Sequence, residues 1–287
     1  MKRFITVAAL LLCAATLMGH SKIVKDSLQS KVLGRTVMVN VYLPSGYEKS
    51  PQAHYPAVYL LHGLYGTYTD WQKKGSVRGI ADELIASGEA CPMVIIMPNA
   101  GDPDVHHVQN GYFNMPGCRY EDFFFSELIP ALEDKYRCGG AKGQRAVMGL
   151  SMGGGGSTVY AQRHPDKFAS CYAMSAWLDN DMETVNVSDE DKEDKLYIVA
   201  ASVHEHSALA FLDGAGEQTV SELRSVRWFL DCGDDDSLMK LSVGLYLQMR
   251  RLEIPCELRV RNGGHTWEYW HDALRLALPF AARNFTF

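Results

Sequence analysis

Ser151 is the residue whose surroundings point most directly to chemistry. It lies in Gly149-Leu150-Ser151-Met152-Gly153, the one Gly-x-Ser-x-Gly pattern in the chain. An apolar run precedes it at 145–148, and a helix-compatible stretch follows it up to Pro165, which is the strand–turn–helix setting that this motif requires. Glycines on both sides of such a sharp turn avoid clashes and present the hydroxyl to solvent. The pattern predicts a serine that attacks a carbonyl carbon; the alternative is a glycine-rich turn around an idle serine.

A serine hydroxyl needs a base to remove its proton, and His265 is the best-placed histidine. It follows a predicted strand through Arg261-Asn262-Gly263-Gly264 and precedes the last predicted helix, so it lies at a loop tip. His62 is expected to pack or hydrogen-bond beneath the site. The remaining candidates lie in loops, at a helix end or in a segment without a clear pattern: His106, His107, His164, His204 and His206.

An acid that orients the imidazole is expected in the loop after the penultimate strand, which gives the chain order Ser, Asp, His. That loop contains three consecutive aspartates, Asp234, Asp235 and Asp236. Only one of them needs to approach the imidazole, and the residues alone leave the choice among the three open.

Two backbone amides are candidates for holding the oxyanion of the reaction. One is the amide of Met152, because the helix that begins after Ser151 directs its first N–H groups toward the nucleophile. The other is the amide of Leu64, in the loop after an early central strand, where the small Gly63 lets the backbone approach a substrate oxygen.

These residues must be positioned by a sheet with helices around it. Alternating apolar residues at 37–43 predict an opening hairpin, and dense apolar runs predict buried strands at 57–61, 93–97, 145–148, 196–201, 226–230 and 256–260. Apolar residues spaced by three and four predict helices at 77–87, 121–136 and 266–283. Repeated strand–helix alternation is typical of an α/β domain with a mostly parallel sheet. We expect a single domain over 21–287, with a loop or small helical excursion between residues 175 and 224.

The first 20 residues predict a secretory signal peptide. Met1-Lys2-Arg3 supplies a positive start, residues 4–18 an apolar stretch, and residues 19–21 a small polar exit. The apolar stretch is shorter than a stable membrane span needs. Lipid attachment through Cys13 is disfavoured because the residue before it, Leu12, is not small. We therefore expect a secreted or periplasmic protein.

Composition excludes several function classes. With 47% hydrophobic and 22% charged residues the chain is typical of a soluble globular protein. A net charge of -6 and scattered Lys and Arg do not provide the basic surface of a nucleic-acid binder. The acidic run at 189–194 lacks the glycine and ligand spacing of a calcium loop, and the absence of Cys-x-x-Cys disfavours zinc. We expect no metal, no cofactor and no nucleic-acid partner; a Cys118–Cys138 disulfide and buried free thiols both stay open.

Taken together, the motifs resemble the esterase D family of α/β-hydrolases, over nearly the whole chain after the signal. This family includes feruloyl and acetyl-xylan esterases, S-formylglutathione hydrolases and mycolyltransferases of the antigen 85 type. The resemblance rests on Val41-Tyr42-Leu43-Pro44 with Gly46-Tyr47, Tyr59-Leu60-Leu61-His62-Gly63, Tyr120-Glu121 with Glu127-Leu128-Ile129-Pro130, Gly149 to Gly154, and Gly263-Gly264-His265 with Trp267 and Trp270.

The resemblance implies an α/β-hydrolase fold, with a mostly parallel central sheet and helices on both faces. It maps the acid onto Asp236, with Asp235 as the next choice, and the oxyanion donors onto Leu64 and Met152. Two departures are the lack of a matching pattern at 175–224, which leaves the substrate open, and the four glycines at 153–156, which suggest close packing under the turn.

The implied activity is hydrolysis of a carboxylic ester through an acyl-enzyme. An exported enzyme of this kind would act on small-molecule or polysaccharide-linked esters, such as feruloyl or acetyl groups on plant polysaccharide, whereas S-formylglutathione is a cytoplasmic substrate. The alternatives are transfer of the acyl group to a sugar or lipid acceptor by the same three residues, and a catalytically silent binding module. The oligomeric state stays open.

Overall fold

The computed structural model describes residues 20–101, 111–182 and 195–287. The predicted signal peptide except His20, the acidic run at 189–194 and the pair His106 and His107 lie outside these ranges. Among the described residues, none of the helices combines the length and the apolar character needed to cross a membrane.

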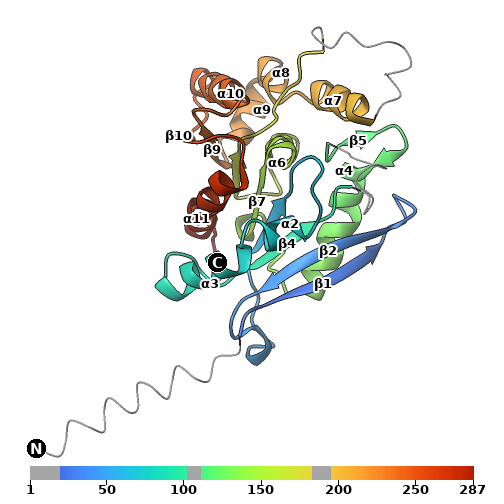
Figure 1. Ribbon diagram of the computed structural model, residues 1–287, viewed down its shortest axis with the longest axis vertical. Helices are drawn as coiled ribbons and strands as arrows, with labels where there is room; N and C mark the ends of the chain where they lie inside the picture. Colours follow the sequence, from blue (N-terminus) through green and yellow to red (C-terminus); the bar gives the residue numbers. More distant parts are fainter. Residues whose placement is uncertain (1–19, 102–110, 183–194) are drawn as a thin grey trace, which may run out of the picture.

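One eight-stranded sheet organises the described chain (Figure 1). Its spatial order is β1-β2-β4-β3-β7-β8-β9-β10, in which β1 and β2 run antiparallel to their neighbours and every other adjacent pair is parallel. The predicted mostly parallel α/β sheet is therefore confirmed. The strands are β1 (Lys22–Gln29), β2 (Thr36–Leu43), β3 (Ala57–Leu61), β4 (Val94–Pro98), β7 (Arg145–Leu150), β8 (Ser170–Met174), β9 (Arg227–Gly233) and β10 (Cys256–Arg261).

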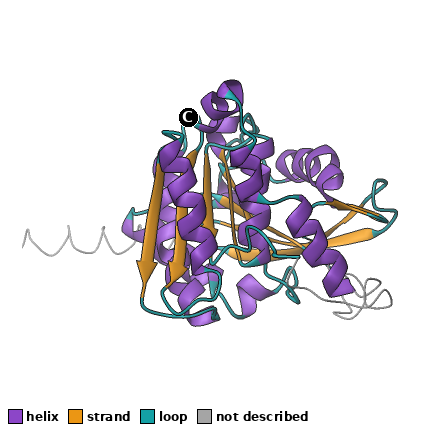
Figure 2. Ribbon diagram, turned by 90° about the horizontal axis from the view of Figure 1, so that it is seen from above, coloured by secondary structure: helices purple, strands orange, loops and turns teal. Residues whose placement is uncertain are grey.

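Helices cover both faces of this sheet, as Figure 2 shows from above. They are α2 (Asp70–Lys73), α3 (Val77–Ser87), α4 (Tyr120–Phe123), a π-helical turn (Phe124–Leu128), α5 (Ile129–Lys135), α6 (Met152–Arg163), α7 (Lys195–Glu205), α8 (Ala208–Asp213), α9 (Glu217–Leu223), α10 (Met239–Arg251) and α11 (Trp267–Asn284). Short 3₁₀ turns lie at Tyr47–Lys49 and Lys142–Gln144, and a small hairpin joins β5 (Asn114–Met115) to β6 (Cys118–Arg119).

The central strands contribute alternate residues to two separate cores. In β3, Val58 and Leu60 pack with α3 and α11, whereas Tyr59 and Leu61 pack with the helices of the opposite face. Since successive side chains of a strand point to opposite faces, a strand that is apolar at every position must be covered on both. This explains why the densest apolar runs of the sequence became the centre of the sheet.

The prediction of a strand at 196–201 is wrong, because these residues form α7. Val199 and Val203 are two of its buried residues, and their spacing of four is helical. A short apolar run cannot be assigned to strand or helix by periodicity alone. With α8 and α9, this helix makes up the helical excursion expected between 175 and 224.

Two strands lacked a sequence signal strong enough to predict. β8 reads Ser-Cys-Tyr-Ala-Met and contains no β-branched residue, although it is buried throughout. β1 is an edge strand with exposed and half-buried residues. All six described cysteines are free thiols, so the Cys118–Cys138 bridge is not formed, and burial raises the pKa of both thiols.

Candidate active site

Ser151 occupies the sharp turn between β7 and α6. Its φ of 54° and ψ of -120° are strained for a residue with a side chain. Three backbone hydrogen bonds hold it there: the Ser151 amide donates to the Met174 carbonyl at 2.9 Å, and the Ser151 carbonyl accepts from the amides of Gly155 and Trp177, each at 3.0 Å. The strained turn is thus held in place by the following helix, by the last residue of β8 and by the segment after β8.

The glycines after Ser151 let α6 approach the neighbouring backbone more closely than any side chain would allow. A Cβ on Gly153 would lie 2.5 Å from the His62 carbonyl oxygen, and one on Gly155 would lie 2.1 Å from the Trp177 carbonyl oxygen. Both distances are far below van der Waals contact. The close packing suggested by the glycine run is therefore present, and it seats α6 beneath the loops that follow β3 and β8.

The three predicted polar residues meet at the carboxyl end of the sheet. The His265 Nε2 atom lies 2.9 Å from the Ser151 Oγ atom, and the His265 Nδ1 atom lies 2.8 Å from the Asp236 Oδ2 atom. An ionised carboxylate can only accept hydrogen bonds, so Nδ1 carries the proton and Nε2 is free to accept from the serine hydroxyl. The arrangement can accept a proton from Ser151 and hold the resulting imidazolium against a negative charge.

Asp236 is the aspartate that reaches the imidazole. Its side chain is fully buried, and its Oδ1 atom accepts from the Leu238 amide at 2.9 Å. Burial opposes ionisation, but the hydrogen bonds from His265 and from the Leu238 amide more than offset it and hold the pKa of Asp236 below its usual value. The carboxylate is therefore ionised at neutral pH.

The other two aspartates of the run are exposed and brace the histidine loop instead. The Asp234 Oδ1 atom accepts from the Gly263 amide at 3.0 Å, and the Asp235 amide donates to the Gly263 carbonyl at 3.0 Å. The residues alone did not separate these roles, because the three aspartates are identical in type and differ only in the direction that the tight turn gives them.

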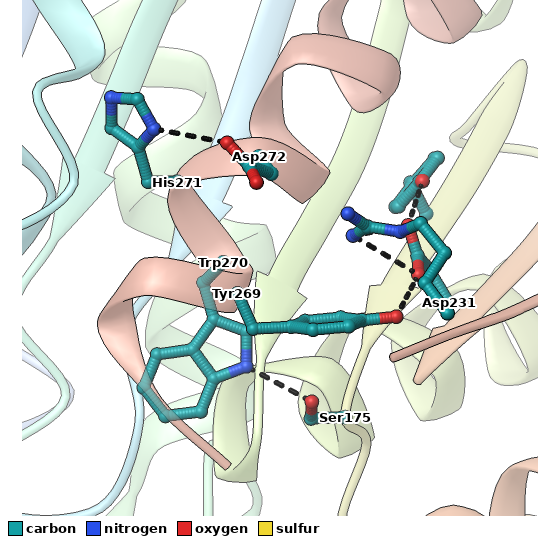
Figure 3. A network of polar contacts seen from close by, with 8 residues as sticks. Ser175, Asp231, Tyr269, Trp270, His271 and Asp272 are labelled. Atoms are coloured by element: carbon teal, nitrogen blue, oxygen red, sulfur yellow. Dashed lines mark hydrogen bonds and ion pairs between the residues drawn. The ribbon is translucent and has the colours of Figure 1, made fainter. Parts of the chain in front are cut away.

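Trp270 and Ser175 were not among the site residues predicted from the sequence. The Trp270 ring stands edge-on to the His265 ring, with 4.8 Å between centroids. Its Nε1 atom donates to the Ser175 Oγ atom at 3.0 Å (Figure 3). Trp270 belongs to the quoted family motif, so the resemblance pointed to it, whereas Ser175 directly follows β8, a strand that had no sequence signal.

A cavity of about 450 Å³ opens beside the nucleophile. Its wall contains Ser151 and His265 together with the loop after β3, a charged pair and two tryptophans. The lining residues are Gly63, Leu64, Tyr65, Gly66, Asp70, Lys74, Leu150, Ser151, His265, Thr266, Trp267 and Trp270. A Cβ on Gly63 would lie 3.4 Å from the Ser151 Cβ atom, so this loop passes directly over the nucleophile.

The two predicted oxyanion donors flank Ser151 from different elements. Leu64 lines the cavity, and Met152 is the first residue of α6. A helix N-terminus carries unsatisfied N–H groups and a partial positive charge, which favour a developing negative charge nearby.

His62 lies beneath this site, as expected, and is fully buried. Its Nε2 atom accepts from the Ala100 amide at 3.0 Å, so its Nδ1 atom donates to the Gly63 carbonyl at 2.8 Å. Burial lowers the pKa of His62 and keeps it neutral. The other described candidates point elsewhere: His164 contacts Glu121, His204 contacts Asp179, and His206 stacks on Phe113. Within the described ranges, no group of three or more His, Cys, Asp or Glu residues could hold a metal ion.

Comparison with known proteins decides the family. The Esterase family model matches residues 30–281, which is most of the chain. The chain belongs to the esterase family. A solved ferulic acid esterase is 47% identical, with a TM-score of 0.88 over 93% of this chain and 100% of that one.

Two further proteins are similar to this chain at lower sequence identity. It is 33% identical over 153 residues to an endo-1,4-beta-xylanase/feruloyl esterase of Xylanibacter ruminicola, an alignment that covers 52% of this chain and 21% of that protein. The chain thus spans about a fifth of the length of that curated relative. An S-formylglutathione hydrolase from Agrobacterium tumefaciens shares the fold at 20% identity, with a TM-score of 0.71 over 93% of this chain and 95% of that one.

These matches confirm the resemblance to the esterase D family and the α/β-hydrolase fold that it implied. They also confirm, at the level of the family, the prediction of a carboxylic-ester hydrolase.

Proposed function

We propose that this esterase is an exported serine esterase that cleaves feruloyl or acetyl esters of plant polysaccharide through an acyl-enzyme on Ser151. The observation that carries the proposal is the continuous line of hydrogen bonds from Asp236 through His265 to Ser151, ending at the wall of an open cavity. A hydroxyl 2.9 Å from an unprotonated imidazole nitrogen is within reach for general-base catalysis.

The reaction proceeds in two halves. His265 takes the proton of Ser151 as Oγ attacks the ester carbonyl carbon, and the amides of Leu64 and Met152 stabilise the oxyanion. Collapse of this intermediate breaks the bond to the alcohol, which leaves with the proton from His265. A water molecule, deprotonated by the same imidazole, then attacks the acyl-enzyme and releases the acid and a free Ser151. Asp236 stays ionised throughout and stabilises the imidazolium.

Two observations favour an aromatic acyl group. The cavity presents the rings of Trp267, Trp270 and Tyr65, which are flat apolar surfaces suited to a cinnamate-type ring. The solved relative that is 47% identical is named a ferulic acid esterase, and the Xylanibacter ruminicola relative combines that activity with a xylanase in one name. The export part of the proposal rests on the pattern of the first 20 residues.

The test is hydrolysis of methyl ferulate, a nitrophenyl acetate and acetylated xylan by the wild type and by Ser151→Ala. Ser87→Ala, which changes an exposed serine at the end of α3, is the control. We expect activity on methyl ferulate in the wild type and the control and its loss by at least ~10³-fold in Ser151→Ala. Full activity in Ser151→Ala would refute the assignment of Ser151 as nucleophile. Activity on the two acetyl esters, with none on methyl ferulate, would refute the feruloyl assignment.

A further inference from the structure

A buried cluster beneath the site contains a carboxylate that the proposed reaction does not use. Asp231, in β9, is fully buried, and three side chains converge on it (Figure 3). The Tyr269 hydroxyl donates to its Oδ1 atom at 2.6 Å, and the Tyr172 hydroxyl donates to its Oδ2 atom at 2.6 Å. The Arg261 Nη2 atom lies 3.4 Å from both carboxylate oxygens. We call these four residues the Asp231 cluster.

Three members of the Asp231 cluster come from the elements that carry the base and the acid, and the fourth, Tyr172, lies in β8. Arg261 is the last residue of β10, and Tyr269 lies in the first turn of α11, so they stand four residues before and four residues after His265. Asp231 itself lies five residues before Asp236. Both ends of the histidine loop are therefore tied to one carboxylate on the strand that leads to the orienting acid.

Packing joins the loop to the same cluster. Gly263 has a φ of 140°, and a Cβ at this position would lie 2.8 Å from the Cδ2 atom of Tyr269, so the loop backbone rests on that ring. The Arg261 guanidinium also lies over the Tyr269 ring, 4.2 Å from the ring centroid. Moving Tyr269 would therefore move Gly263, which lies two residues from His265.

The energetics favour a geometric role for this cluster. A buried ion pair costs much of its attraction in desolvation, and apolar residues of similar volume often give equal stability. Here the Nε atom of Arg261 is buried without a hydrogen-bond partner among the described residues, which adds to that cost. The charged cluster supplies directional bonds, which apolar packing does not, and these bonds fix β8, β9, β10 and α11 relative to one another.

We propose that Asp231 is a positioning residue for the base, holding the two ends of the histidine loop through Arg261 and Tyr269 so that His265 stays within hydrogen-bond reach of both Asp236 and Ser151. This inference rests on the catalytic role proposed for those three residues. A displacement of a catalytic group by about 1 Å can lower the rate by up to ~100-fold, so loosening the histidine loop is expected to lower kcat.

Two tyrosines offer a matched test. Tyr269→Phe and Tyr172→Phe each remove one hydroxyl that donates to Asp231 at the same distance of 2.6 Å, but only Tyr269 is attached to the histidine loop. The measurements are the melting midpoint and the separate kcat and KM for methyl ferulate, assayed well below both melting midpoints. We expect similar drops in melting midpoint, but a kcat lowered about fivefold to tenfold, with KM within twofold, in Tyr269→Phe alone. The kcat of Tyr172→Phe should stay within about twofold of the wild type.

Equal kcat losses in the two tyrosine variants, or no loss in Tyr269→Phe, would overturn the proposal. Arg261→Gln changes the other end of the histidine loop and should lower kcat in the same way. A kcat equal to that of the wild type in this variant would also overturn the proposal. Ser151→Ala, run alongside, separates this inference from the proposed function. If Ser151→Ala is inactive while Tyr269→Phe is fully active, only the positioning role fails, whereas an active Ser151→Ala removes the basis of both.

Discussion

The two sides of the candidate site are built in different ways. The nucleophile turn is specified mostly by its own motif: Ser151 joins β7 to α6, and its backbone bonds Gly155 in that helix and Met174 and Trp177 at and after the end of β8. The base and the acid come from two separate loops, after β9 and β10, that meet only because their strands are adjacent in the sheet. The comparison teaches that a short motif can specify a strained serine, whereas the placement of His265 depends on contacts across the fold.

The largest effect should come from the acid that the two loops bring to the imidazole. Asp236→Asn keeps the shape of the side chain, but its amide can donate a hydrogen bond to His265 instead of accepting one. This favours the imidazole tautomer with the proton on Nε2, which cannot accept the serine proton. We expect kcat to fall by about 10³-fold to 10⁴-fold. Asp234→Asn and Asp235→Asn are the matched controls, and each should stay within roughly tenfold of the wild type, because both side chains are exposed. An asparagine at position 234 also keeps an oxygen that can accept from the Gly263 amide. Steady-state kinetics on methyl ferulate measures all three, and a reversed order would move the role of the acid to another residue.

Some of these features could be predicted from the amino-acid sequence, and others depend on the folded chain. The turn at Ser151, the loop position of His265 and the central strands were predictable, because each depends on neighbours in the sequence. The choice of Asp236 needed the family resemblance, since three identical side chains stand in a row and only the folded turn separates them. Asp231 and Ser175 carried no local signal, because their partners lie 30 to 95 positions away. Strand β8 was missed because it contains no β-branched residue.

A second prediction tests the local side of the comparison. Gly155→Ala places a Cβ 2.1 Å from the Trp177 carbonyl oxygen, and we expect it to destabilise the fold by about 2–3 kcal/mol. Gly79→Ala, at an exposed position of α3 with open space around it, should instead stabilise by about 0.5–1 kcal/mol. Urea unfolding measures both, and equal stability in the two variants would contradict the close packing of α6.

The third prediction concerns acid. Hydrogen bonds in the folded protein hold the pKa of Asp236 below its usual value despite burial, so this carboxyl contributes stability that is present above its unfolded pKa of about 4. That contribution is lost as the pH falls through the lower folded pKa. The free energy of unfolding of the wild type should therefore decline more steeply below pH ~4 than that of Asp236→Asn. Parallel declines in the two proteins would show that Asp236 gains nothing from its partners.

The smallest effect is expected at the tryptophan that flanks the base. Trp270→Phe keeps an aromatic ring beside His265 but removes the Nε1 donor to Ser175, and we expect a loss of about 1 kcal/mol in stability and roughly twofold in kcat. Trp267→Phe is the control, because it changes the neighbouring tryptophan of the cavity wall without affecting that hydrogen bond. Thermal unfolding with kinetics distinguishes them; a larger stability loss in the control would assign the effect to ring packing alone.

In the proposed reaction, Ser151 is activated by His265, a base held on a distant loop. Labelling with a fluorophosphonate, followed by peptide mapping in a mass spectrometer, tests it most directly in the wild type and in His265→Ala. We expect the phosphonate on Ser151 in the wild type and little or none in His265→Ala after the same time. Modification of a different residue, or equal labelling of Ser151 in both proteins, would contradict it.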